Sequence, residues 1–223
     1  MSDSDITEQE WRKVIRALED ILPYYERLNR LNTLGQLNRW RRVAARWARD
    51  GDTVLEIGPG SGGFAAILNC DNLLCLDPSR RILTHARQYL GKRVQFVGGI
   101  AEKLPFNEER FDIVFCVFSF RDFMNKEASL REIKRVLRKR GRVCILDVSL
   151  PESGILKRLV NFHIYKLAPH LSALALPGRM RAAWKSTQYI ELLRTLESFG
   201  GASQYPDMLA DGWIYSLGIV PSL

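Results

Sequence analysis

Short apolar runs alternate with amphipathic stretches through the middle of the chain. Five runs have the length and composition of buried strands, over residues 53–57, 73–77, 94–97, 111–118 and 143–148. Between most of them, apolar residues recur every three or four positions, which is the period of an α-helix. This alternation predicts an α/β fold, a Rossmann-like doubly wound sheet that is mostly parallel.

The first fifty residues precede this alternation and have a helical pattern. Thr7 and Glu10 have the spacing of a capping box, and apolar residues follow at helical spacing up to Leu22, where Pro23 interrupts the helix. Two further helical patterns follow, up to Arg49. We expect these N-terminal helices to pack over the open side of the glycine-rich turn that comes next.

The composition changes again after the last of the five strands. Residues 151–185 mix apolar and basic residues at helical spacing, which predicts a helical lid insertion. A helix starting at residue 186 and strand patterns at 203–205 and 213–220 predict a terminal hairpin with an antiparallel C-terminal edge strand. We therefore expect one domain, with a helical cap at 1–50, a cofactor-binding core at 51–150, a lid at 151–185 and a C-terminal helix and hairpin at 186–223.

Length and composition limit the class of protein. With 223 residues, 46% of them hydrophobic, the chain can bury one full α/β core. Its four cysteines lack C-x-x-C spacing and three lie in strand-like runs, so we expect neither a metal site nor disulfides. The N-terminus has no apolar signal segment, and no stretch approaches the about 20 apolar residues that span a bilayer. These features predict a cytoplasmic protein.

The formal net charge of +8 allows a nucleic-acid partner, an anionic membrane surface or a basic exterior. The basic residues just before Gly141 fall in the last turns of a predicted helix, where cations complement the helix dipole. This explanation makes a nucleic-acid partner the less favoured choice. The apolar and basic residues of the predicted lid suggest peripheral contact with an anionic membrane at its inner face. The sequence indicates no oligomeric state.

A glycine-rich turn after the first strand carries the candidate chemistry. Residues 54–63 read Val-Leu-Glu-Ile-Gly-Pro-Gly-Ser-Gly-Gly and precede a helix-like run at residues 64–68. Glycine lets backbone N–H groups approach a nucleotide closely, and the N-terminus of a following helix would point the same way. Gly58, Gly60 and Gly63 also fit G-x-G-x-x-G, so the glycines alone would allow NAD.

Two carboxylates shift this interpretation. Glu56 lies two residues before Gly58, where a carboxylate suits a ligand that carries an amino group. Asp77 ends the second strand, where it can accept hydrogen bonds from both hydroxyls of a ribose. Together they favour S-adenosylmethionine over NAD.

With these motifs the chain resembles the class I S-adenosylmethionine-dependent methyltransferases, and in particular the UbiE/MenG-type C-methyltransferases of ubiquinone and menaquinone biosynthesis. Residues 25–29 are similar to that family's Y-D-x-M-N segment, residues 101–106 to its A-E-x-L-P-F segment, and residues 118–122 to its F-G-L-R-N segment. Residues 162–163 are similar to an F-H pair ahead of the substrate lid.

The resemblance implies which residues form the site. The implied cofactor-binding residues, with the two carboxylates included, are Glu56, Gly58, Gly60, Ser61, Asp77, Ile100, Ala101, Glu102 and Val117. Methylation of a hydroxylated ring at carbon would be helped by a base and a nearby cation. The candidate catalytic residues are therefore Arg121, which could stabilise a phenolate, Tyr25 and His163, which could position a water or relay a proton, and Asp122, a further carboxylate in reach. Val117 stands where the family often has Ser, and Asp122 stands where it has Asn.

The resemblance also implies an activity. We expect transfer of a methyl group from S-adenosylmethionine to a ring carbon of a demethylated prenyl quinol, which is a lipophilic small molecule. Two alternatives remain at this point. One is a methyltransferase of the same fold that acts on an O- or N-acceptor, and the other is a cofactor-binding interaction protein without turnover.

Overall fold

The structure is a computed structural model that describes residues 7–33, 35–148 and 214–219, with seven single positions between 155 and 176. The predicted helix from residue 186 and the strand pattern at 203–205 lie outside the described residues. The same holds for His163 and for most of the predicted lid.

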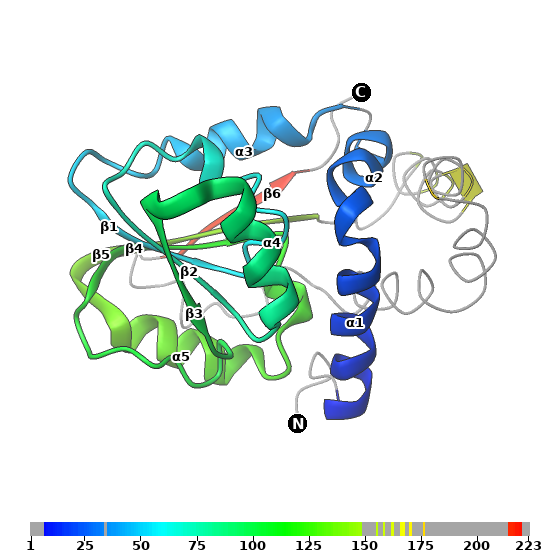
Figure 1. Ribbon diagram of the computed structural model, residues 1–223. Helices are drawn as coiled ribbons and strands as arrows, with labels where there is room; N and C mark the ends of the chain where they lie inside the picture. The colour runs from blue at the N-terminus through cyan, green and yellow to red at the C-terminus, as the bar shows by residue number, and fades with distance from the viewer. Residues whose placement is uncertain are drawn as a thin grey trace.

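Three α-helices and a short 3-10 turn form the N-terminal cap. Helix α1 (Glu8–Ile21) begins at the predicted capping box, in which the side chains of Thr7 and Glu10 each accept a backbone hydrogen bond from the other residue. The 3-10 turn η1 (Leu22–Tyr24) contains Pro23, which has no N–H to continue the helix. Helices α2 (Tyr25–Asn32) and α3 (Leu37–Ala45) follow, and Figure 1 shows α1 standing beside the core.

Six strands of the described residues form one sheet in the order β3-β2-β1-β4-β5-β6. They are β1 (Thr53–Ile57), β2 (Asn72–Asp77), β3 (Val94–Gly98), β4 (Phe111–Val117), β5 (Leu137–Val148) and β6 (Ile214–Ile219). Neighbouring strands pair in parallel throughout. The sequence therefore predicted the five core strands and their parallel arrangement, and only β5 starts well before its predicted range.

Helices cover both faces of this sheet (Figure 1). Helix α5 (Lys126–Val136) packs on one face through Leu130 and Ile133. Helices α3 and α4 (Arg80–Leu90) pack on the other face through Ala44 and Ala86. The hydroxyl of Ser79 accepts the Ile82 N–H and caps α4. The core thus has the predicted doubly wound architecture.

The prediction of an antiparallel C-terminal edge strand is wrong. β6 pairs with β5 in parallel, with Val143 opposite Ile214 and Val148 opposite Ile219. An alternating pattern identifies a strand but does not give its direction. Two parallel strands of one sheet need a connection of about a dozen or more residues, and residues 149–213 are long enough to supply it.

Two local predictions are also wrong. The run after the glycine turn forms only a 3-10 turn, η2 (Ala65–Ile67), because so few residues cannot offset the cost of nucleating an α-helix. The second is wrong in part: helix α5 ends at Val136, so Lys134 and Arg135 lie in its last turn, but Arg138, Lys139 and Arg140 lie in β5. There the Arg138 guanidinium pairs with the Asp112 carboxylate of β4, so a cross-strand ion pair, rather than the helix dipole, accounts for Arg138.

No helix among the described residues is long and apolar enough to cross a membrane. At the described positions of the predicted lid, Ile155 and Phe162 are exposed, and Lys166 is exposed as well. Contact of this segment with a membrane surface stays a prediction.

Candidate active site

A pocket opens at the carboxyl ends of the parallel strands, next to the point where the strand order reverses between β1 and β4. Gly58 and Gly60 border it after β1, Asp77 borders it at the end of β2, and Ser119 borders it after β4. Doubly wound sheets bind their ligands at this position, because the loops that follow the two strands diverge there.

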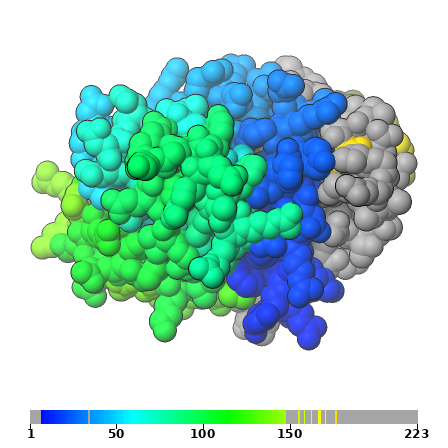
Figure 2. All heavy atoms as spheres, in the orientation of Figure 1, coloured from blue at the N-terminus to red at the C-terminus, as the bar shows by residue number. Residues whose placement is uncertain are grey.

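Helix α1 supplies an apolar wall of this pocket. Trp11, Ile15 and Leu18 line it from one face of the helix, and Leu22 of η1 continues the wall. Figure 2 shows α1 packed along the side of the core. The sequence predicted an amphipathic helix over the glycine turn, and its apolar period is the signal for these lining residues, which were not among the predicted site residues.

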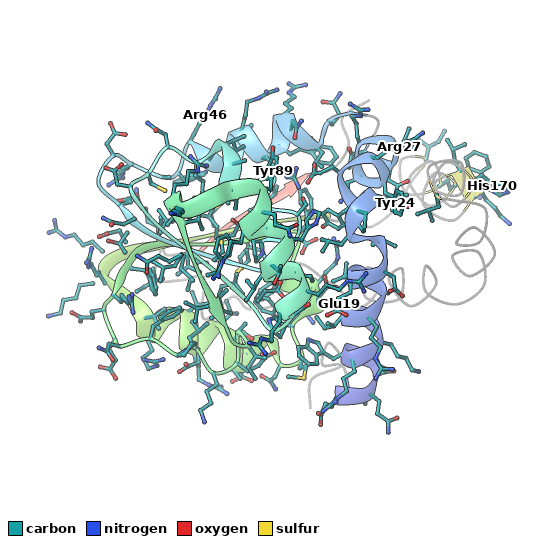
Figure 3. The ribbon with its side chains drawn as sticks, in the orientation of Figure 1. Glu19, Tyr24, Arg27, Arg46, Tyr89 and His170 are labelled. Carbon is teal, nitrogen blue, oxygen red and sulfur yellow. The ribbon has the colours of Figure 1, made fainter. Side chains whose placement is uncertain are left out.

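Polar contacts hold α1 against the start of α4. The Ser79 hydroxyl donates a hydrogen bond of 2.5 Å to Glu19, whose side chain is labelled in Figure 3. Arg81 lies 3.7 Å from Asp20 in an exposed ion pair. Surface ion pairs contribute about 0–1 kcal/mol, so the contact through Ser79 is the firmer of the two.

The glycine turn brings bare backbone to the pocket. Gly58, Gly60 and Gly62 have φ angles of 74°, 54° and 84°, a region that L-residues rarely adopt. A Cβ on Gly58 would lie 2.5 Å from the Cβ of Ser119. Glycine at position 58 is therefore required both by its conformation and by its neighbour.

Asp77 presents a buried carboxylate at the end of β2. It is 5% exposed, lines the pocket and accepts the Ser79 N–H at 2.8 Å. Burial raises the pKa of Asp77 to about 7 against the effect of this hydrogen bond, and the charges of Glu19 and Asp122 raise it further. Hydrogen bonds donated by a ligand would stabilise the ionised form of this carboxylate.

Asp122 is the other buried carboxylate of the pocket. It lines the pocket beside Tyr25, and its Oδ1 atom has no hydrogen-bond partner among the described residues. Burial raises the pKa of Asp122 to about 6, the Arg121 guanidinium opposes this shift, and Asp147 adds to it. Burial also raises the pKa of Tyr25, so its hydroxyl stays protonated near neutral pH.

Arg121 lies beside the pocket and is not among the residues that line it. Its Nη1 atom is 2.8 Å from Oδ1 of Asp147, and its Nε atom is 3.7 Å from Oδ1 of Asp122. Burial works to lower the pKa of Arg121, but these two carboxylates outweigh it and raise the pKa. Arg121 is thus a buried cation between two carboxylates, and its direct contact with an acceptor stays a prediction.

The structure brings part of the predicted cofactor set together. Ile100, Ala101 and Glu102 line the pocket with the glycines and Asp77. The carboxylate of Glu102 also accepts the N–H groups of Met124 and Asn125 at 2.7 and 3.1 Å, so it fixes the backbone just before α5.

Ser61 and Val117 are not among the residues that line the pocket. The Ser61 hydroxyl donates to Glu26, and Val117 packs in the core beneath α3 and α4. Their contact with a cofactor stays a prediction, as does the role of His163, which lies outside the described residues.

Glu56 is buried on the far side of β1. It is 1% exposed, does not line the pocket and accepts a hydrogen bond of 3.6 Å from the Cys75 thiol. Burial raises its pKa to about 7, although the Arg41 charge opposes the shift. Its predicted contact with an amino group stays a prediction.

The raised pKa of Glu56 predicts a pH-dependent stability. Because the pKa is about 7 in the folded chain and ordinarily 4.5, the folded chain keeps this proton longer. The resulting stabilisation is complete at low pH and is lost as the pH rises through about 7. We expect Glu56→Gln to raise the free energy of unfolding by about 2–3 kcal/mol at pH 8 and to change it little at pH 4.5. Urea titrations at the two pH values measure this, with Glu108→Gln at an exposed position as control. An effect that is equal at both pH values would contradict it.

The fold and the site define a class I S-adenosylmethionine-dependent methyltransferase, and residues 55–145 match the family described as "Methyltransferase domain". The chain is 33% identical over 163 residues to the demethylmenaquinone methyltransferase of Deinococcus radiodurans, with 69% of this chain and 68% of that protein covered. It is 30% identical over 185 residues to the ubiquinone/menaquinone biosynthesis C-methyltransferase UbiE of Stenotrophomonas maltophilia, with 76% and 72% covered. The chain belongs to this UbiE/demethylmenaquinone methyltransferase family.

A solved structure agrees with the class. A S-adenosylmethionine-dependent methyltransferase from Thermotoga maritima, described as a possible histamine N-methyltransferase, aligns with a TM-score of 0.52 and 27% identity. The alignment covers 69% of this chain and 70% of that one. S-adenosylmethionine is accordingly the cofactor of this enzyme.

Proposed function

We propose that this enzyme methylates a ring carbon of a demethylated prenyl quinol. The observation that carries the proposal is the pocket itself, which joins the apolar wall of α1 to the buried carboxylate of Asp122 and the hydroxyl of Tyr25. A prenylated ring needs an apolar surface for its body and polar groups for its hydroxyls. The names of the relatives in Deinococcus and Stenotrophomonas support a quinone-type acceptor.

The cofactor would lie against the carboxyl ends of β1, β2 and β3. We assign the bare backbone of Gly58 and Gly60 to its amino-acid part, Asp77 to the ribose hydroxyls, and Ile100 and Ala101 to the adenine. S-adenosylmethionine carries no phosphate, so the site does not need the helix N-terminus that dinucleotide sites use. The short η2 turn is therefore adequate here.

The role of Asp77 predicts a measurable loss. We expect Asp77→Ala to weaken S-adenosylmethionine binding by about 1.5–3 kcal/mol, because hydrogen bonds from the ribose to a charged acceptor are lost. Isothermal titration calorimetry measures this, with Asp71→Ala as control because Asp71 is exposed just before the same strand. Equal affinities for the wild type and Asp77→Ala would remove Asp77 from the site.

The cofactor supplies an electrophilic methyl group, so the chain has to align the acceptor and raise the nucleophilicity of its carbon. A hydroxylated ring is more reactive at carbon once its hydroxyl proton, with a pKa of about 10, is shared or removed. Asp122, with a pKa of about 6, is ionised at pH 7 and can accept that proton. Tyr25 stays protonated and can donate a hydrogen bond to a ring oxygen.

Arg121 would act through Asp122. Its guanidinium lies 3.7 Å from the Asp122 carboxylate and favours the ionised form of that group. The same positive charge favours a phenolate in the pocket. In this assignment Asp122 is the base and Arg121 is a positioning residue.

The experiment that tests the proposal is turnover with a panel of acceptors. The purified full chain is incubated with S-adenosylmethionine and demethylated quinols, phenols or amines, and the products are identified by mass spectrometry. We expect a product that gains one methyl group on a ring carbon of a quinol. Methylation of an oxygen or a nitrogen would replace the quinol proposal, and cofactor binding without any product would favour an interaction protein.

A further inference from the structure

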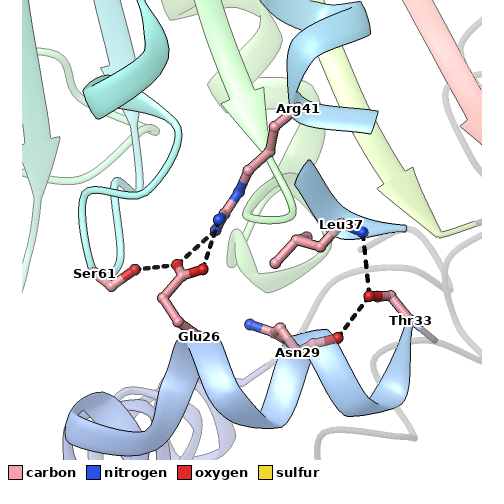
Figure 4. Close-up of polar contacts among 6 residues, drawn as sticks. All are labelled: Glu26, Asn29, Thr33, Leu37, Arg41 and Ser61. Atoms are coloured by element: carbon pink, nitrogen blue, oxygen red, sulfur yellow. Dashed lines mark hydrogen bonds and ion pairs between the residues drawn. The ribbon is translucent and has the colours of Figure 1, made fainter. Parts of the chain in front are cut away.

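Glu26 and Arg41 connect the N-terminal cap to the glycine turn (Figure 4). The Arg41 guanidinium donates two hydrogen bonds to the Glu26 carboxylate, at 2.8 and 2.9 Å. The Ser61 hydroxyl donates a further hydrogen bond of 2.5 Å to the same carboxylate. One carboxylate on α2 therefore links a cation on α3 to a side chain of the turn.

The backbone of the turn also packs directly on this ion pair. A Cβ on Gly63 would lie 2.5 Å from Oε1 of Glu26 and 2.6 Å from Nη1 of Arg41. Glycine at position 63 thus lets the turn approach the pair as closely as Gly58 approaches Ser119. Close contacts at both ends of the turn therefore depend on glycine.

Arg41 fixes the direction of Glu26. The Arg41 side chain is only 6% exposed, whereas the Glu26 side chain is 45% exposed and could otherwise turn to solvent. A planar guanidinium that binds both oxygens of a carboxylate fixes its orientation as well as its position. The Glu26 oxygen that Ser61 meets is therefore held in place by α3.

We infer that Glu26 and Arg41 are positioning residues for cofactor binding. Three glycines of the turn have positive φ angles, and such a backbone loses much conformational freedom when it is ordered. A turn that is already ordered avoids this cost when the ligand binds. The pair holds the turn through Ser61 and so raises the affinity for S-adenosylmethionine without touching it.

A simpler role would be to fasten α2 to α3. The two roles differ in one respect. If the pair only fastens α2 to α3, a substitution of Glu26 changes the free energy of unfolding, and its effect on cofactor affinity is the same with or without the Ser61 hydroxyl. If the pair positions the turn, the effect on cofactor affinity requires the Ser61 hydroxyl. A double-mutant cycle between Glu26 and Ser61 separates them.

The experiment measures S-adenosylmethionine binding to the full chain by calorimetry, without an acceptor. Glu26→Gln is made in the wild type and in Ser61→Ala, and urea unfolding is recorded for each protein. We expect Glu26→Gln to weaken binding about tenfold in the wild type, the equivalent of one charged contact, and less than about twofold in Ser61→Ala. Glu8→Gln is the control, because it breaks the exposed ion pair with Arg12 on α1.

Two results would overturn the inference. One is an unchanged affinity in Glu26→Gln, and the other is an equal loss in both backgrounds. If Glu26→Gln does not fold, Arg41→Lys in the same two backgrounds replaces it, because lysine keeps the charge and loses the bidentate contact. The outcome does not depend on the quinol proposal, since no acceptor is present.

Discussion

Replacing Arg121 with alanine lowers the free energy of unfolding by about 3–5 kcal/mol, because it removes one partner of a buried ion pair. The side chains of Arg121 and Asp147 are 12% and 2% exposed, and Nη1 and Oδ1 are 2.8 Å apart. Urea unfolding measures the change. Arg131→Ala is the matched control, because its pair with Glu127 on α5 is about 60% exposed and should contribute less than about 1 kcal/mol. Similar losses in the two variants would contradict the prediction.

The same variant also separates the two roles of Arg121. At a temperature where Arg121→Ala is folded, we expect the acid limb of its pH–rate profile to move to higher pH. The direction follows because removal of a cation beside Asp122 raises the pKa of that carboxyl. An unmoved acid limb, together with normal turnover, would leave Arg121 a purely structural residue.

Replacing Asp122 with asparagine lowers turnover by about 100-fold, the lower end of the contribution of a general base. The variant keeps the shape of the side chain and removes its proton-accepting charge. Single-turnover rates with the acceptor found in the panel measure the loss, and Asp50→Asn, at an exposed position, is the control. The acid limb near pH 6 should disappear from the variant's profile.

Retention of most of the rate in Asp122→Asn would contradict the base role. The family that the chain resembles has Asn at this position, so that result would assign proton removal to a water, because Tyr25 and Arg121 keep their own protons. The experiment therefore decides whether the departure at position 122 changes the chemistry of this enzyme.

Local signals in the sequence predicted most of the core. The range of β1 agrees with the prediction residue for residue, since a β-branched apolar run ends there at glycine. Thr7 and Glu10 form the capping box of α1 as their spacing indicated. Each of these features depends on a few neighbouring residues, so a short stretch of sequence is enough to predict it.

The errors depend on partners that are distant in the sequence. The direction of β6 is set by its pairing with β5, and the strand conformation at the start of β5 is set by its pairing with β4. No local pattern encodes such pairings. Glu56 is a different case: alternation along β1 turns it to the face opposite to Ile57, which lines the pocket, and its contact with a cofactor stays a prediction.

The apolar wall of the pocket comes from α1, which lies outside the matched residues 55–145. Residues 55–145 build most of the sheet and border the proposed cofactor site. A separate segment, α1, forms the adjoining wall. Substitutions at Trp11, Ile15 or Leu18 can reshape that wall while the packing between the strands and α4 or α5 is unchanged. Under the proposed assignment, acceptor preference would diverge among descendants of one enzyme through changes in α1, while the residues that fold the sheet stay the same.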